Sequence, residues 1–307
     1  MKKRHQKNSS KTLLKTRQRR SIKRFFQNRT NFIPPAATKN SIDHIHRLDA
    51  HVHTCFSDGS ATVKQVEEAC LKLKTGCLIT DHNEIRGSLA LFDRKNIPTI
   101  PSMEIGSREQ IELLLFFRHA YQAEDFFKNY IEPFRRKCRY SFLPLSLDYL
   151  SDAASEYDTI VSIPHPFAPF WKNIEYGKKR RDVIIRTLQR VDGIEVYNGT
   201  ATHRANRKSM MLCQTLGAIP LAGSDSHSVK TIGSAGIDFF HPVTSNNLFD
   251  SIRNNHICHI FEHETRHRHV SNTYHLAVNH SKNFVLKQDF LLQIWQKNIL
   301  QKHWKLR

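Results

Sequence analysis

Short apolar segments alternate with segments of helical periodicity along most of this chain, and this alternation restricts the fold more than any other feature. The strand candidates are RLDAHV, GCLIT, PTIPSMEI, IELLLFF, DTIVSIP, GIEVYN and AIPLAGS. Helices are expected at about 62–74, 84–95, 180–190, 202–216 and 244–254, and within 122–154. Strands that alternate with helices favour a parallel sheet or barrel, and about seven such units favour a closed α/β barrel.

The first strand candidate ends in a His-x-His pair, His51 and His53. Successive side chains of a strand point to opposite faces, so these two imidazoles lie on the same face and can share one metal ion. Asp58 follows in a Ser-Asp-Gly turn, where the chain can fold back toward the same point. A solvated strand end is the alternative reading of this pair taken alone.

Polar residues of ligand type follow the other strand candidates as well. They are Asp81 and His82, Glu104, His165, Glu195 and Asn198, and Asp225 and His227. The carboxyl ends of barrel strands form the edge at which barrel enzymes assemble their active sites. Structural histidines bonded to the backbone explain any one of these residues but fit the whole series poorly, so the pattern predicts a metal site.

The series HVHTCFSDGS, LITDHNE, SMEI, IPHP, GIEVYN and GSDSH resembles the polymerase and histidinol phosphatase (PHP) superfamily over about residues 46–230. The resemblance implies a distorted (βα)7 barrel that binds three divalent metals and hydrolyses phosphoesters. The ligands that it implies, position by position, are His51, His53, Asp58, His82, Glu104, His165, Asp225 and His227.

One position departs from the family pattern. Where PHP proteins have a further histidine at the start of a strand after Glu104, the segment IELLLFF has Glu112. A carboxylate also binds hard or borderline divalent ions, so we expect Glu112 to take that ligand position. His119 is a poorer substitute, because it lies beyond the end of the strand candidate and is expected in an exposed loop.

Five histidines with several carboxylates suit two or three Mn, Fe or Zn ions, and the motifs offer no thiolate cluster for a structural zinc. Such ions activate a water for in-line attack at phosphorus. Asp58 and Asp225 are candidates to bridge or orient the metals, and His227 is a candidate to assist the leaving oxygen. The sequence leaves the assignment of these roles open.

A phosphate substrate also requires positive or polar groups outside the metal cluster. The candidates are Asn198, the two arginines Arg135 and Arg139 in FRRKCRY, and Arg180 in the run KKRR. Solvated charge runs are the competing explanation for both arginine clusters.

The net charge of +19 is carried by the two ends of the chain. Residues 1–40 contain thirteen Lys or Arg and no acid, residues 265–307 contain eight against one acid, and residues 41–264 contain 26 against 27. We therefore expect a basic, disordered leader (1–40), a PHP-like domain (41–264) and a basic C-terminal extension with an amphipathic helix (265–307).

These features favour a metal-dependent hydrolase of a phosphomonoester or small nucleotide. An exonuclease that uses the basic tails to attract RNA or DNA ends is the alternative, and a non-catalytic module that binds nucleic acid or a membrane surface is a third reading. The six cysteines form no C-x-x-C pair, and neither a signal peptide nor an apolar run of about 18 residues is present. A soluble cytoplasmic protein is expected, with its oligomeric state left open.

Overall fold

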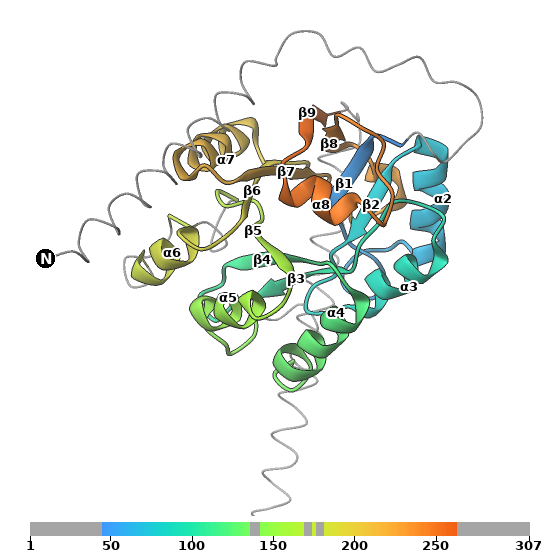
Figure 1. Ribbon diagram of the computed structural model, residues 1–307. Coiled ribbons are helices and arrows are strands. Elements are labelled where there is room, and N and C mark those ends of the chain that lie inside the picture. Colours follow the sequence, from blue (N-terminus) through green and yellow to red (C-terminus); the bar gives the residue numbers. More distant parts are fainter. Residues whose placement is uncertain (1–44, 136–141, 169–173, 176–180, 263–307) are drawn as a thin grey trace, which may run out of the picture.

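The computed structural model describes residues 45–135, 142–168, 174–175 and 181–262, in which helices surround two β-sheets (Figure 1). The strands are β1 (Arg47–Val52), β2 (Gly76–Ile79), β3 (Ser102–Gly106), β4 (Glu112–Phe117), β5 (Thr159–Ile163), β6 (Gly193–Asn198), β7 (Ile219–Gly223), β8 (Ala235–Phe239) and β9 (Ile257–Glu262). The α-helices are α2 (Val63–Leu73), α3 (Arg86–Arg94), α4 (Ala120–Phe126), α5 (Leu147–Ser155), α6 (Arg181–Leu188), α7 (His203–Leu216) and α8 (Leu248–Arg253). Short turns of other helix types follow at η2 (Phe127–Ile131) and η5 (Val229–Thr231).

The strands form a four-stranded sheet, in the order β2-β1-β8-β9, and a five-stranded sheet, in the order β3-β4-β5-β6-β7. β1 and β2 are parallel, as are β5, β6 and β7, whereas β4 is antiparallel to both of its neighbours. The segment between β3 and β4 is too short for a parallel crossover, which needs about a dozen residues, so these two strands form a hairpin.

Two isolated parallel bridges join the sheets near the carboxyl ends of their strands. Val52 pairs with Ser226 after β7, and His82 pairs with Glu104 of β3. The mixed α/β class is therefore confirmed, but the closed (βα)7 barrel is not what the described residues show. They form two sheets that are bridged beside both edge strands of the larger sheet, β3 and β7, and β4 of that sheet is antiparallel to its neighbours.

Local sequence signals explain where the main helices begin and end. Thr62 caps α2 in a capping box with Gln65, and Thr202 caps α7 by accepting a hydrogen bond from the Ala205 N–H. Gly217 ends α7 in the left-handed conformation, with φ 66°. The helices near 62–74 and 202–216 are thus confirmed.

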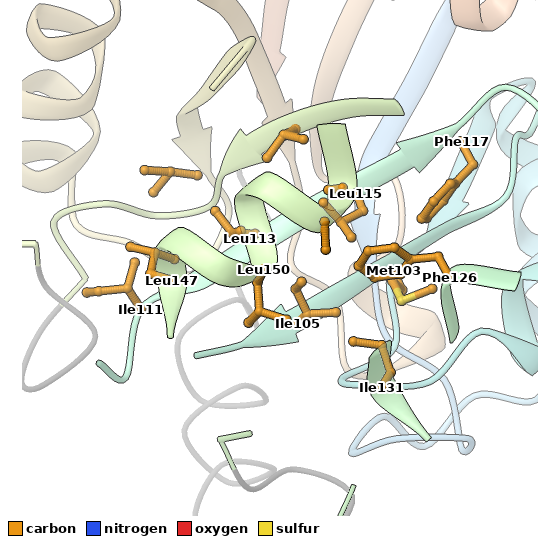
Figure 2. Packing of buried hydrophobic residues seen from close by; sticks show 14 of the residues in the cluster. Met103, Ile105, Ile111, Leu113, Leu115, Phe117, Phe126, Ile131, Leu147 and Leu150 are labelled. Atoms are coloured by element: carbon orange, nitrogen blue, oxygen red, sulfur yellow. The ribbon is translucent and has the colours of Figure 1, made fainter. Parts of the chain in front are cut away.

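The largest apolar cluster lies between the five-stranded sheet and the helices α4 and α5 (Figure 2). Met103 and Ile105 of β3 contribute to it together with Leu113 of β4, and Phe126 and Leu150 cover them from the helices. Because side chains alternate along a strand, this packing turns the intervening residue of β3, Glu104, toward the opposite face. The core therefore fixes the direction of a candidate ligand.

The sequence patterns missed β8 and β9, which extend the smaller sheet beyond β1. The basic leader at 1–40 and the C-terminal extension at 265–307 lie outside the described residues. In the part of the chain that the structure describes, no helix is both long and apolar enough to cross a membrane.

Candidate metal centre

The predicted ligands come together around the two bridges that join the sheets. They are His51 in β1 and His53 and Asp58 after it, His82 after β2, Glu104 in β3, Glu112 at the start of β4, His165 after β5, and Asp225 and His227 after β7. Eight of these residues are buried and Asp58 is half-buried. The strand ends therefore deliver all nine of the sequence-predicted ligands to one place.

Four overlapping groups of these side chains each have ligand atoms within 4.8 Å of one another. The groups are His53, Asp58, His82 and His227; His51, His53 and Glu104; His51, His165 and Asp225; and His82, Glu104 and Glu112. Shared members link the groups into one continuous cluster. This arrangement has the ligand number and the mixture of imidazole and carboxylate that suit more than one divalent transition metal.

Glu104 lies at the centre of the cluster. Its Oε2 atom is 2.8 Å from His82 Nδ1 and 3.5 Å from His53 Nε2, and its Oε1 atom is 3.3 Å from His165 Nε2. Neither oxygen makes a hydrogen bond of good geometry to another described residue, although both are buried. Burial of a carboxylate without hydrogen bonds lowers the stability of the fold, and a bound cation would compensate this loss. The donor set therefore fits divalent metal ions.

Glu112 faces the same cluster from the neighbouring strand. Gly106 pairs with Glu112 in the β3–β4 hairpin, so Glu112 and Glu104 project from the same face. The Oε1 atom of Glu112 lies 3.7 Å from His82 Nδ1, and its Oε2 atom lies 3.6 Å from His165 Nε2. His119, by contrast, is an exposed residue that precedes α4.

Charges within the cluster keep the carboxylates of Asp58 and Glu104 ionised. Burial alone would raise the pKa of Asp58, but the positive charges of His227 and His82 hold it well below its usual value. Burial is likewise outweighed at Glu104, where His82 and His51 hold the carboxyl pKa well below its usual value. Anionic oxygens are therefore present at neutral pH for a cation to bind.

The same interactions raise the pKa values of two histidines. Burial disfavours the imidazolium of His51, yet the carboxylates of Glu195, Asp225 and Glu104 raise its pKa well above the usual value. Burial also opposes protonation of His82, whose pKa Glu104 and Asp58 nevertheless raise. Without metal each of these imidazoles holds a second proton, and a metal ion has to displace that proton to bind.

His227 and His53 have opposite tendencies. Burial opposes the charge on His227, but Asp58 and Asp225 raise its pKa to about 9. Burial and the neighbouring charge of His227 lower the pKa of His53 to about 4. His53 therefore presents neutral nitrogen at pH 7, as a metal ligand must.

A second layer of buried carboxylates holds the segments that carry the ligands. Asp81 accepts hydrogen bonds from the Thr54 backbone N–H (2.7 Å), from Thr54 Oγ1 (2.6 Å) and from Ser57 Oγ (2.5 Å), which fixes the turn that carries Asp58. The sequence pattern includes Asp81 beside His82 but gives it no role, and it does not point to Thr54 or Ser57. A short polar residue two to four positions after a ligand is the signal that points to them.

Asp49 has the matching function between β1 and β7. It accepts hydrogen bonds from Ser224 N (2.8 Å), Ser224 Oγ (2.6 Å) and Gly233 N (2.8 Å). Burial raises the pKa of this carboxyl to about 6 against the effect of those donors. Asp49 is on the same face of β1 as His51, so alternation along the strand is the sequence signal for it.

The proposed substrate-binding residues have different surroundings. Arg135 donates to Glu84 Oε2 (2.7 Å) and to the Asn83 carbonyl (3.2 Å), and its side chain is 16% exposed. Asn198 is buried and donates from Nδ2 to Glu195 and Asp225. Arg139 and Arg180 lie outside the described residues.

Comparison with known proteins gives the cluster a family context. Residues 203–257 match the model of the PHP-associated family. A two-domain protein of Bacteroides vulgatus, which contains a predicted PHP-like metal-dependent phosphoesterase, aligns with a TM-score of 0.50 at 15% identity over 74% of this chain and 70% of that one. The resemblance to PHP proteins is confirmed.

Two further structures have a fold similar to that of this chain at low sequence identity. PsfC of Pseudomonas syringae aligns with a TM-score of 0.53 at 14% identity, over 76% of this chain and 98% of its own. The lesion-specific endonuclease Q of Pyrococcus furiosus aligns with a TM-score of 0.52 at 18% identity, over 68% of this chain and 56% of its own. No curated protein matches the chain in sequence.

Proposed function

We propose that this protein is a metal-dependent hydrolase that cleaves a phosphoester, with a phosphomonoester or small nucleotide as substrate. The observation that carries the proposal is the convergence of nine ligand-type side chains in one cluster, within which Glu104 is a buried carboxylate surrounded by imidazole nitrogens. Histidines with a purely structural role would not have to gather around one buried carboxylate. The PHP-like fold supports the same conclusion.

The donor set suits two or three Mn, Fe or Zn ions, which when bound supply an activated water and neutralise the charge on phosphoryl oxygens. The chain itself holds the ligands in place and excludes bulk water, since most of them are buried. No side chain of the cluster is required as a covalent nucleophile.

His227 is our candidate to assist the leaving oxygen. Its Nδ1 atom lies 3.0 Å from the Asp225 carbonyl, which only accepts, so Nδ1 carries a hydrogen. The Nε2 atom therefore faces Asp58 Oδ2 at 3.2 Å and is the atom that binds metal or holds a proton.

A nuclease is the second candidate. A structure of endonuclease Q in complex with a 27-mer duplex, with an abasic lesion at the active site, aligns with this chain with a TM-score of 0.51. The basic segments 1–40 and 265–307 would attract a nucleic-acid backbone regardless of its sequence. Free cysteines in the described residues fit the cytoplasm as the location for either activity.

A phosphate-release screen tests the proposal. Purified full-length protein with added Mn is incubated with nucleotides, sugar phosphates and short oligonucleotides, and His82→Ala is compared with His119→Ala, which removes an exposed imidazole outside the cluster. We expect turnover in the wild type and in His119→Ala and none in His82→Ala. Salt-sensitive cleavage of oligonucleotides alone would favour the nuclease, and no turnover of any phosphoester by metal-loaded protein would reject both candidates.

A further inference from the structure

We propose that Glu195 and Asn198, at the end of β6, are positioning residues of the metal centre. They bind no metal themselves and hold His51, His165 and Asp225 in ligand geometry. These three residues form one of the groups that can hold an ion. The inference rests on the proposed function. It gives a role to β6, which lies between β5 and β7 and supplies none of the nine candidate ligands.

Glu195 fixes the ring of His51. Its side chain is buried, and its Oε1 atom lies 2.9 Å from His51 Nδ1. An ionised carboxylate only accepts hydrogen bonds, so His51 Nδ1 carries the hydrogen and donates it. In the neutral ring, the form that binds metal, the lone pair of His51 is then on Nε2, which lies 3.5 Å from Asp225 Oδ1 in the cluster.

The other oxygen of Glu195 fixes the backbone at His165. Oε2 accepts a hydrogen bond from the His165 backbone N–H at 2.7 Å. His165 has φ 27°, a conformation that costs energy for a residue with a side chain and persists only when its surroundings hold it. One carboxylate thus orients two histidines that come from different strands.

Asn198 extends this arrangement to Asp225. Its Nδ2 group donates to Glu195 Oε2 (2.9 Å) and to Asp225 Oδ2 (3.2 Å), and Thr200 Oγ1 donates to the same Asp225 oxygen (2.9 Å). With Oδ2 engaged, Asp225 directs Oδ1 toward His53 Nε2 at 3.2 Å. Asp225 also has positive φ, at 51°.

Glu195→Gln is the sharpest test because it keeps the size of the side chain and changes only its hydrogen-bonding pattern. A Gln amide has one accepting oxygen and one donating nitrogen. If the oxygen stays with His165 and Asn198, the NH2 group faces His51 Nδ1 and favours the tautomer with hydrogen on Nε2, which blocks metal binding. If the amide is reversed, its NH2 group meets the donors of His165 and Asn198.

Affinity for Mn2+ alone is measured by competition with a chromophoric chelator, so the readout does not depend on hydrolysis. We expect Glu195→Gln to weaken Mn2+ binding by roughly 10-fold to 100-fold, as substitution of residues that orient metal ligands does. Thr200→Val, which removes one donor to Asp225, should weaken it by a smaller factor. Glu67→Gln is the matched control, because Glu67 is a buried glutamate of the outer helix α2 that contacts Arg94 and Asn96.

Thermal unfolding of each metal-free variant shows whether a loss of Mn2+ affinity is accompanied by a loss of the folded state. Weakened Mn2+ binding in folded Glu195→Gln, with Glu67→Gln unchanged, supports the inference. Wild-type Mn2+ affinity in Glu195→Gln overturns it, as does an equal loss in Glu67→Gln. If Glu195→Gln does not fold, Asn198→Ala, which removes both donations from Nδ2, decides by the same criterion. The proposed function fails separately, if wild-type protein binds Mn2+ and hydrolyses no phosphoester.

Discussion

The Oε2 atom of Glu112 lies 3.6 Å from the Nε2 atom of His165, although Glu112 begins β4 and His165 follows β5. β4 runs antiparallel to β5, so the first residue of β4 reaches the edge at which β5 ends. Reversal of one strand therefore brings a carboxylate into a cluster made of residues at the carboxyl ends of other strands.

We predict that Glu112 is a metal ligand in the position of a PHP histidine. Glu112→Gln should lower the occupancy of one metal more than that of the others, and Glu112→His should retain it, because imidazole also binds these ions. Elemental analysis after dialysis against limiting Mn measures the occupancy. Glu109→Gln is the control, since Glu109 precedes the same strand and instead accepts from Leu147 N. Full occupancy in Glu112→Gln would show that Glu112 binds no metal.

The double variant His51→Ala/His53→Ala should lose bound metal and phosphoester turnover while it keeps its fold. The apolar clusters that hold the sheets and helices together include neither histidine. Metal content is measured beside the far-UV circular dichroism spectrum. Unchanged metal content in this variant would contradict the assignment of both ligands.

Metal affinity should rise with pH between about 6.5 and 9. The pKa of His227 is raised from 6.5 to about 9 in the folded protein. In metal-free protein its ion pairs therefore stabilise the fold fully below pH 6.5, and this contribution is lost as the pH rises through 9. Metal binding has the opposite dependence because the ligand must lose its proton. Calorimetry at pH 7 in buffers of different ionisation enthalpy should show proton release on Mn2+ binding, reduced by about one proton in His227→Gln. Equal proton release in the two proteins would exclude His227 as a ligand.

Arg135 should contribute to stability through Glu84. Burial would raise the pKa of Glu84, but hydrogen bonds from Arg86 and Arg135 lower it to about 2. Arg135→Ala leaves this buried carboxylate with fewer donors and should cost about 1–3 kcal/mol in the free energy of unfolding. Urea denaturation measures the loss, which should shrink in the background of Glu84→Gln. A loss of substrate affinity with unchanged stability would instead support a purely substrate-binding role.

Deletion of residues 1–40 should leave turnover of a small phosphomonoester almost unchanged, because none of the nine candidate ligands lies in that segment. If this basic segment binds nucleic acid, the deletion should also weaken oligonucleotide binding and flatten its salt dependence, since fewer counterions are released. Steady-state kinetics and fluorescence anisotropy measure the two effects. Loss of small-substrate turnover in a folded, metal-loaded truncation would place the segment at the active site.

Much of the fold could be predicted because local patterns and tertiary packing agree. RLDAHV forms β1 from its first residue to its last, and Gly217 ends α7 where expected. β8 and β9 were missed because their segments, around AGIDF and ICHIFE, contain charged or polar residues that find partners only in the folded chain. Asp238 of β8, for example, pairs with Arg47 of β1 at 2.9 Å.

The closed barrel was expected because each strand candidate was counted as a parallel unit. The short link between IELLLFF and the preceding strand was the signal against that reading, since it leaves no room for a crossover. The candidate ligands could be predicted from single positions after strands. Roles such as that proposed for Glu195 could not, because they depend on hydrogen bonds between side chains that are distant in sequence.

Turnover of one phosphomonoester by a single preparation, measured before metal removal, after chelation and after Mn is added back, tests the proposed function most directly. We predict that turnover is lost with the metal and returns with Mn in the wild type, while His51→Ala/His53→Ala stays inactive throughout. Undiminished turnover in protein shown by elemental analysis to be free of metal would contradict the proposal that the cluster is a metal-dependent hydrolytic centre.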